Sequence, residues 1–141
     1  MTGAGRPSVL FVCVRNGGKS QMAEALLRSV AGDRVETHSA GTDPGTAINE
    51  QSADALAEVG IDMRTGHHPT PIDPLLLARV DRVVVLGREA VVDPVPGMRG
   101  RIEHWDTDEP SDRGIDGMAR MRLVRDDIAA RCRALARELS R

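Results

Sequence analysis

Apolar and polar positions follow two different periods along this chain, and the change of period predicts where strands and helices lie. The unbroken apolar run at 9–12 and the segment 80–86, which contains three consecutive valines, predict two strands that are buried on both faces. Strict alternation over 35–39 predicts a half-exposed edge strand, and the short run 102–105 predicts a fourth strand. Between these runs the apolar residues recur every three or four positions, which is typical of amphipathic helices.

Four helices are expected from this spacing and from the residues at their ends. Asn49 and Asp73 are favoured N-cap residues, and Pro74 suits a first helical turn. The inward-facing stripes include Val30, Val59 and Cys132. The first helix is expected to open at Ser20, and the four helices are predicted at 20–31, 49–60, 75–79 and 118–139.

Strands that alternate with helices predict an α/β fold: a four-stranded parallel sheet with right-handed crossovers and helices on both faces. The length of 141 residues suits a single domain, which we expect at 7–141. The small and polar residues 1–6 are expected to form a mobile N-terminal tail.

Composition narrows the range of partners. A net charge of -2 and a pI near 6.1 give no reason to expect binding to nucleic acid or to an anionic membrane. No segment resembles a secretion signal or approaches the ~18 apolar residues of a membrane span, so a cytoplasmic protein is expected. Cys13 and Cys132 are too few for a disulfide scaffold, and the four histidines lack metal-ligand spacing, so we expect reduced thiols and no metal site.

One stretch, residues 9–22, carries the candidate chemistry. It reads Val-Leu-Phe-Val-Cys-Val-Arg-Asn-Gly-Gly-Lys-Ser-Gln-Met, so a buried strand delivers Cys13 to a glycine-containing loop before a helix. Such a turn directs backbone N–H groups and the positive end of the helix dipole at one point, which favours a tetrahedral oxyanion and a thiolate. The predicted oxyanion-binding residues are Val14, Arg15, Asn16, Gly17, Gly18, Lys19 and Ser20.

The loop itself admits three interpretations. Its ending Gly18-Lys19-Ser20 matches a nucleotide-binding P-loop, but Cys13 stands where that pattern requires its first glycine. Cys13 could also be a buried core thiol beside an ordinary turn. Read as Cys-x5-Lys-Ser, the segment resembles the Cys-x5-Arg-Ser motif of protein tyrosine phosphatases, with lysine in place of arginine.

The position of this loop near the N-terminus resembles the low-molecular-weight branch of the phosphatases, which includes arsenate reductases, and the resemblance covers nearly the whole chain. It implies that Asn16 and the segment from Ser39 to Thr42 support the loop. His104-Trp105 followed by Asp108-Glu109-Pro110 is similar to the arsenate reductases, where the acid before proline protonates the departing oxygen. That position is Glu109, although Asp108 and Glu109 are both candidate general acids from chemistry alone.

Within the reductases the chain most resembles mycothiol-coupled arsenate transferases, because 87–100 contains no cysteine and Lys19 replaces the usual arginine. The resemblance implies that Cys13 is the catalytic thiol, that Lys19 compensates the charge of arsenate and that Ser20 donates to the sulfur. Mycothiol would be the thiol co-substrate, a mycoredoxin-type reductase would act downstream, and no cofactor would be bound.

Two alternatives to arsenate transfer remain. The first is a tyrosine or small-phosphoester phosphatase with Cys13 as nucleophile, although Ser111-Asp112 stand where phosphotyrosine-specific relatives often carry tyrosines, and this chain has none. The second is a non-catalytic module that binds an anion or nucleotide. Cys132 lies on an apolar helical stripe, so it is predicted to be a core residue and not a resolving thiol.

Overall fold

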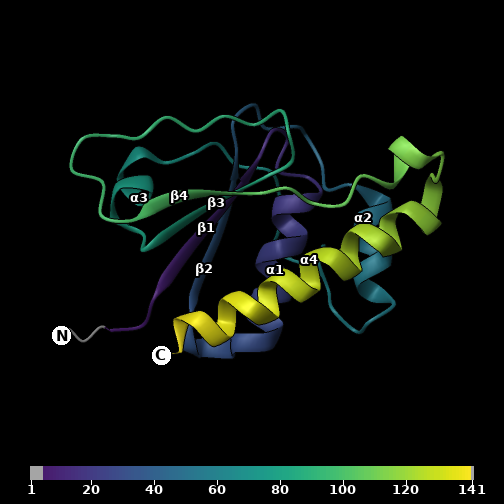
Figure 1. Ribbon diagram of the computed structural model, residues 1–141, viewed down its shortest axis with the longest axis horizontal. Coiled ribbons are helices and arrows are strands. Elements are labelled where there is room, and N and C mark those ends of the chain that lie inside the picture. Colours follow the sequence, from purple (N-terminus) through teal and green to yellow (C-terminus); the bar gives the residue numbers. More distant parts are fainter. Residues whose placement is uncertain (1–4, 141) are drawn as a thin grey trace.

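Four parallel strands form one sheet at the centre of the molecule (Figure 1). The structure, a computed structural model, describes residues 5–140, so part of the predicted tail, residues 1–4, lies outside the described residues. The strand order is β2-β1-β3-β4, with every neighbouring pair parallel, as the sequence predicts. The strands are β1 (Ser8–Cys13), β2 (Glu36–Gly41), β3 (Arg82–Leu86) and β4 (Arg101–Trp105).

Helices cover both faces of this sheet, which confirms the predicted architecture. One face packs against α1 and α4, with α2 lying against both of these helices, and the other face packs against α3. The long helix α4 crosses the molecule in front of α1 (Figure 1). The helices are α1 (Lys19–Ala31), α2 (Glu50–Ala57), α3 (Pro74–Arg79) and α4 (Gly117–Leu139), with short 3₁₀ turns η1 (Gly32–Arg34) and η2 (Pro110–Arg113).

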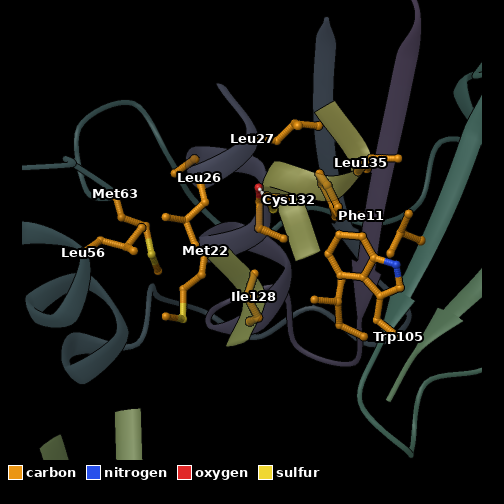
Figure 2. Packing of buried hydrophobic residues seen from close by; sticks show 14 of the residues in the cluster. Phe11, Met22, Leu26, Leu27, Leu56, Met63, Trp105, Ile128, Cys132 and Leu135 are labelled. Atoms are coloured by element: carbon orange, nitrogen blue, oxygen red, sulfur yellow. Dashed lines mark hydrogen bonds between the residues drawn. The ribbon is translucent and has the colours of Figure 1, made fainter. Parts of the chain in front are cut away.

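The larger core cluster lies between β1 and the helices α1 and α4, and Figure 2 shows its packing. Phe11 meets Trp105 at a ring-centroid distance of 5.6 Å. The predicted stripe of α4 faces this cluster, and Cys132 is fully buried within it beside Leu135. The sequence therefore placed Cys132 correctly in the core.

Two residues of the predicted stripes are exposed instead. Val30, in the last turn of α1, is 41% exposed, and Val59 is 50% exposed. Helix α2 ends at Ala57, and the chain then turns through Gly60, whose φ is 80°. Helical spacing identifies the inward face, but it cannot show how far along the helix the core extends.

The strand order places the end of β1 at a topological switch point. The chain leaves β1 toward β2 on one side, while β3 lies on the other side. In open α/β sheets ligands bind outside the carboxyl ends of the strands at such a point. Cys13 is the last residue of β1 and therefore lies there.

Within residues 5–140, no helix combines the length and the apolar character needed to span a bilayer.

Candidate active site

The loop between β1 and α1 is held by the main chain of the segment that follows β2. Four of its carbonyl groups accept hydrogen bonds from backbone N–H groups of that segment, at N···O distances of 2.7–3.0 Å. Because these carbonyl oxygens are bound on the outer side, the loop presents N–H groups on its inner side. The acceptors are Cys13, Val14, Arg15 and Gly17, and the donors are Thr42, Asp43, Gly45 and Asn49.

The inner side of the loop surrounds the sulfur of Cys13. The backbone N–H of Asn16 donates to Cys13 Sγ at 3.2 Å. Within the described chain the N–H groups of Arg15, Gly17 and Gly18 donate no hydrogen bond to protein. Converging amides of this kind, at the start of a helix, form an anion-binding concavity. The predicted oxyanion-binding loop therefore has the geometry that the chemistry requires.

Two glycines allow this close approach of the two segments. A Cβ atom on Gly17 would lie 2.9 Å from the carbonyl oxygen of Ala47, and one on Gly41 would lie 2.7 Å from that of Val14. Both distances are too short for a carbon atom against a fixed backbone oxygen. A side chain at either position would push the loop away from its support.

Asn16, Ser20 and Cys13 are linked by a chain of hydrogen bonds. Ser20 Oγ lies 2.9 Å from Cys13 Sγ and accepts a hydrogen bond from Asn16 Nδ2 at 2.7 Å. Since that oxygen already accepts from Asn16, its own hydrogen is free to point at the sulfur. Both the Ser20 hydroxyl and the Asn16 amide then stabilise negative charge on Cys13.

Ser20 differs from expectation in its place on the helix. Helix α1 begins at Lys19, Gly18 is its N-cap, and no side chain caps the helix. The Ser20 side chain is buried and bonded to Cys13 and Asn16. Its contacts therefore belong to the site and not to the helix terminus.

Asn16 fixes the loop from the inside. It is fully buried and adopts a positive φ of 54°, which asparagine tolerates better than most residues. Its Oδ1 accepts from the backbone N–H of Thr70 at 2.9 Å and from Gln21 Nε2 at 3.3 Å. These bonds tie the loop to α1 and to the chain before α3.

Ser39, predicted to support the loop, makes no side-chain hydrogen bond with it among residues 5–140. Its hydroxyl donates to Glu24 Oε1 at 2.8 Å, and its carbonyl accepts from Thr70 Oγ1 at 3.3 Å. Ser39 therefore acts through α1 and Thr70. The direct support from this segment comes from Gly41 and Thr42.

Lys19 joins the loop to the acidic segment after β4. Its ammonium group donates to Thr107 Oγ1 at 2.9 Å and to Glu109 Oε1 at 2.6 Å. The side chains of Lys19 and Glu109 are only 18% and 20% exposed, so this ion pair is partly shielded from water. The structure thus brings Glu109 to the loop, although 90 positions separate it from Lys19 in the sequence.

Asp108, the other candidate acid, is bound elsewhere. Its carboxylate forms two hydrogen bonds with Arg113, at 2.8 and 3.2 Å. The hydrogen bond with the Arg113 guanidinium lowers the pKa of Asp108 below its usual value. Asp108 is therefore engaged with Arg113, whereas Glu109 contacts Lys19 of the loop, so Glu109 is the better placed of the two carboxyl groups.

The remaining predicted residues lie at the rim or outside the site. Arg15 is exposed and pairs with Asp43 at 2.8 Å, and Val14 packs at the edge of the smaller core cluster. His104 is exposed, whereas Trp105 is buried against Phe11. The positive charge of Arg15 lies near the entrance of the loop, whereas His104 makes no hydrogen bond with the loop among residues 5–140.

Sequence reasoning missed several residues that complete the site. Thr107 is buried and accepts from Lys19, and Thr70 binds Asn16 through its backbone. Gln21 follows the loop motif directly, and its side chain reaches both Asn16 and the carbonyl of His68. Neither threonine carries a local pattern that could have identified it, because its partner lies far away in the sequence.

Comparison with known proteins shows which family the chain resembles. Residues 8–141 match the model of the low molecular weight phosphotyrosine protein phosphatase family. An arsenate reductase of Halalkalibacterium halodurans is 36% identical over 133 residues, covering 91% of this chain and 94% of the relative.

Solved structures show the same likeness. A thioredoxin-dependent arsenate reductase of Corynebacterium glutamicum superposes with a TM-score of 0.80 at 29% identity, over 99% of this chain and 64% of that one. An arsenate reductase of Archaeoglobus fulgidus gives a TM-score of 0.73 at 29% identity, over 91% of this chain and 98% of the other. The chain therefore belongs to the low-molecular-weight phosphotyrosine protein phosphatase family, in the branch that contains the arsenate reductases.

Proposed function

We propose that this protein is an arsenate reductase that transfers arsenate to an external thiol, mycothiol. The observation that carries the proposal is that one of the two thiols lies at the anion loop, whereas the other is buried and chemically inert. Cys13 lies among converging N–H groups, whereas Cys132 is fully buried and its sulfur contacts the carbonyl of Ala23 at 3.5 Å. Burial raises the pKa of the Cys132 thiol to about 12.

An enzyme that regenerates itself internally needs a second thiolate to attack the sulfur or arsenic held at the first. Cys132 cannot supply one, because it stays protonated and shielded in the core. The chain contains only these two cysteines. The thiol that completes the reaction therefore comes from another molecule, in accord with the resemblance to the mycothiol-coupled enzymes.

In the proposed reaction, arsenate binds to the free N–H groups of Arg15, Gly17 and Gly18. The Cys13 thiolate attacks arsenic, a sulfur–arsenic bond forms, and one oxygen leaves as water with a proton from Glu109. Lys19 offers a point charge where arginine would offer a planar fork, so its contribution is charge compensation.

The thiolate of mycothiol then attacks arsenic and displaces Cys13, so arsenic passes to mycothiol as As(V). The two electrons that yield arsenite come later, when a mycoredoxin-type dithiol reductase attacks the mycothiol sulfur and forms a mixed disulfide. Neither step oxidises or reduces Cys13 itself.

The test compares arsenate turnover in the presence of mycothiol and mycoredoxin with hydrolysis of an aryl phosphate. We expect arsenate turnover to dominate, Cys13→Ser to abolish it, and Cys132→Ala to retain most of it. Circular dichroism confirms that both variants are folded. Equal loss in two folded variants would contradict the external-thiol mechanism, and dominant aryl phosphate hydrolysis would favour the phosphatase alternative.

A further inference from the structure

A pocket of about 420 Å³ adjoins the anion loop, between the segment after β2 and the first turns of α4. This volume falls within the range of about 300–1,000 Å³ that is usual for small-molecule sites. Gly17, Gly18 and Lys19 belong both to its lining and to the loop around Cys13. A molecule held in this pocket therefore lies next to an oxyanion bound in the loop.

Three polar side chains of the pocket keep hydrogen-bonding groups that have no partner in the described part of the chain. The guanidinium of Arg120, half-buried on α4, makes no hydrogen bond or ion pair among residues 5–140. The hydroxyl of Thr46 makes none either, and the side-chain nitrogen Nδ2 of Asn49 donates none in that range. The carbonyl oxygen of Asn49 is used to cap α2, where it accepts from the backbone N–H of Ser52 at 2.9 Å.

Arg120 differs in this respect from the other half-buried arginines of α4. Arg125 binds Glu58 at 2.9 Å, and Arg131 binds Asp127 at 3.2 Å. A partly buried guanidinium without a protein partner loses hydration that nothing in the fold replaces. The pocket therefore offers side-chain hydrogen-bond donors from two separate parts of the chain, and Met121 and Val124 add apolar lining.

We propose that this pocket binds the body of the thiol co-substrate, and that Arg120 is its main anchor. The inference rests on the proposed arsenate transfer and adds the place where the acceptor docks. Mycothiol carries its sulfur on an amide-linked, polyhydroxylated body, whose hydroxyl and carbonyl oxygens match the donors of Arg120 and Asn49. With the body held there, the sulfur reaches the arsenic at the loop, a sulfur–arsenic bond forms, and the bond from arsenic to Cys13 breaks. The mycothiol proton passes to solvent, and Cys13 leaves as a thiolate.

The kinetic test varies mycothiol and arsenate separately. Arg120→Ala is expected to raise the KM for mycothiol about tenfold, as loss of charged hydrogen bonds does. The KM for arsenate should change by less than about twofold, because the loop amides are untouched. The KM of Arg120→Lys for mycothiol should lie between the values of the parent and of Arg120→Ala. The matched control is Arg133→Ala, since Arg133 is an exposed arginine of the same helix that does not line this pocket, and its kinetics should equal those of the parent.

A second measurement does not depend on turnover. S-methylated mycothiol, which cannot react, is titrated into ¹⁵N-labelled parent protein, and amide chemical shifts are followed by NMR. Shifts should concentrate at 17–19, 45–49 and 120–124, and they should shrink in Arg120→Ala. Ala47→Phe, which places a ring in the pocket, should weaken the shifts without removing the Arg120 side chain.

The outcomes separate this inference from the proposed function. If the parent turns over no arsenate with any thiol, the proposed function fails, and the titration still decides what the pocket binds. Shifts that map elsewhere, or that are absent, overturn the inference. So does an Arg120→Ala variant whose KM rises for an aryl phosphate but not for mycothiol.

Discussion

Asn16 shows how one side chain can meet several demands of a catalytic loop at the scale of the residue. Its backbone adopts a left-handed conformation with φ 54°. Its side chain donates a hydrogen bond to Ser20 and accepts hydrogen bonds from Thr70 and Gln21. Its backbone N–H also donates to Cys13. The resemblance pointed to Asn16 as a brace, but the partners on either side of it become visible only in the fold.

The two neighbouring acids of the site have different environments, so their substitution should have different effects. Glu109→Gln is expected to lower kcat for arsenate transfer about 100-fold, because it removes the proton donor beside the loop. Asp108→Asn should cost less than about threefold, since Arg113 holds that carboxylate away from the reaction. Steady-state kinetics against pH make the comparison.

The pH profile separates a proton donor from a merely structural carboxylate. A general acid loses activity as rising pH deprotonates it, and that limb should disappear in Glu109→Gln but persist in Asp108→Asn. Equal losses in both variants, or an unchanged profile in Glu109→Gln, would remove Glu109 from the mechanism.

At the scale of the element, an ion pair joins the edge strand β2 to helix α3. Glu36 accepts from Arg79 at 2.6 Å and lies 2.5 Å from the ring nitrogen of His38. The hydrogen bond from Arg79, with a smaller contribution from His38, lowers the pKa of Glu36 to about 2. Its ionised form is therefore the one that stabilises the fold.

Because the folded-state pKa lies below the usual 4.5, this stabilisation is complete above about pH 4.5 and is lost as pH falls toward about 2. Glu36→Gln should lower the free energy of unfolding at pH 7 by about 1 kcal/mol, a modest value because Arg79 is largely exposed. The difference should vanish near pH 2. Urea unfolding at both pH values measures it.

Glu50→Gln serves as the control, since Glu50 is 80% exposed in its pair with Arg64 and should show little change. A Glu36→Gln deficit that persisted unchanged at low pH would mean that packing, and not charge, explains the loss.

Sequence periodicity located every strand and every main helix, but not their ends. Strand β3 begins at Arg82 and not at Val80, because the N–H of Val80 bonds back to Leu76 and ends α3. Such competition between a helix end and a strand start is decided by hydrogen bonds that residue type alone does not encode. The caps at Asn49 and Asp73, in contrast, were predictable, since each side chain bonds to a residue two or three positions away.

At the scale of the whole molecule, Cys132 reports whether the core is intact. It is fully buried, and desolvation raises its pKa to about 12, so a thiol reagent can reach it only when the core opens. In the Cys13→Ser variant, native protein should react with a disulfide reagent only at the rate of global opening. Added urea should accelerate labelling in parallel with unfolding measured by circular dichroism. Rapid labelling without urea would show that α4 separates from α1 in the native state.

The limits of sequence reasoning at this scale follow from distance along the chain. The Cys13 loop was predictable because its strand, glycines and helix start are contiguous. Lys19 and Thr107 are 88 positions apart, and Asn16 and Thr70 are 54 apart, so only the packed sheet brings them together. The resemblance predicted Glu109 as a site residue from the order of the motifs, but its ion pair with Lys19 could be seen only in the structure.

The backbone clamp on the loop has a consequence for how such an enzyme can evolve. Residues 42–49 support the loop chiefly through main-chain N–H groups, which every residue except proline possesses, with one exposed ion pair between Asp43 and Arg15. The side chains of Thr46 and Asn49 line the adjoining pocket instead. On the proposal that the pocket holds the thiol co-substrate, mutation at those two side chains changes which thiol binds, while the main-chain support of the loop is kept. Binding of the oxyanion and choice of the co-substrate thiol would thus diverge independently within one eight-residue stretch.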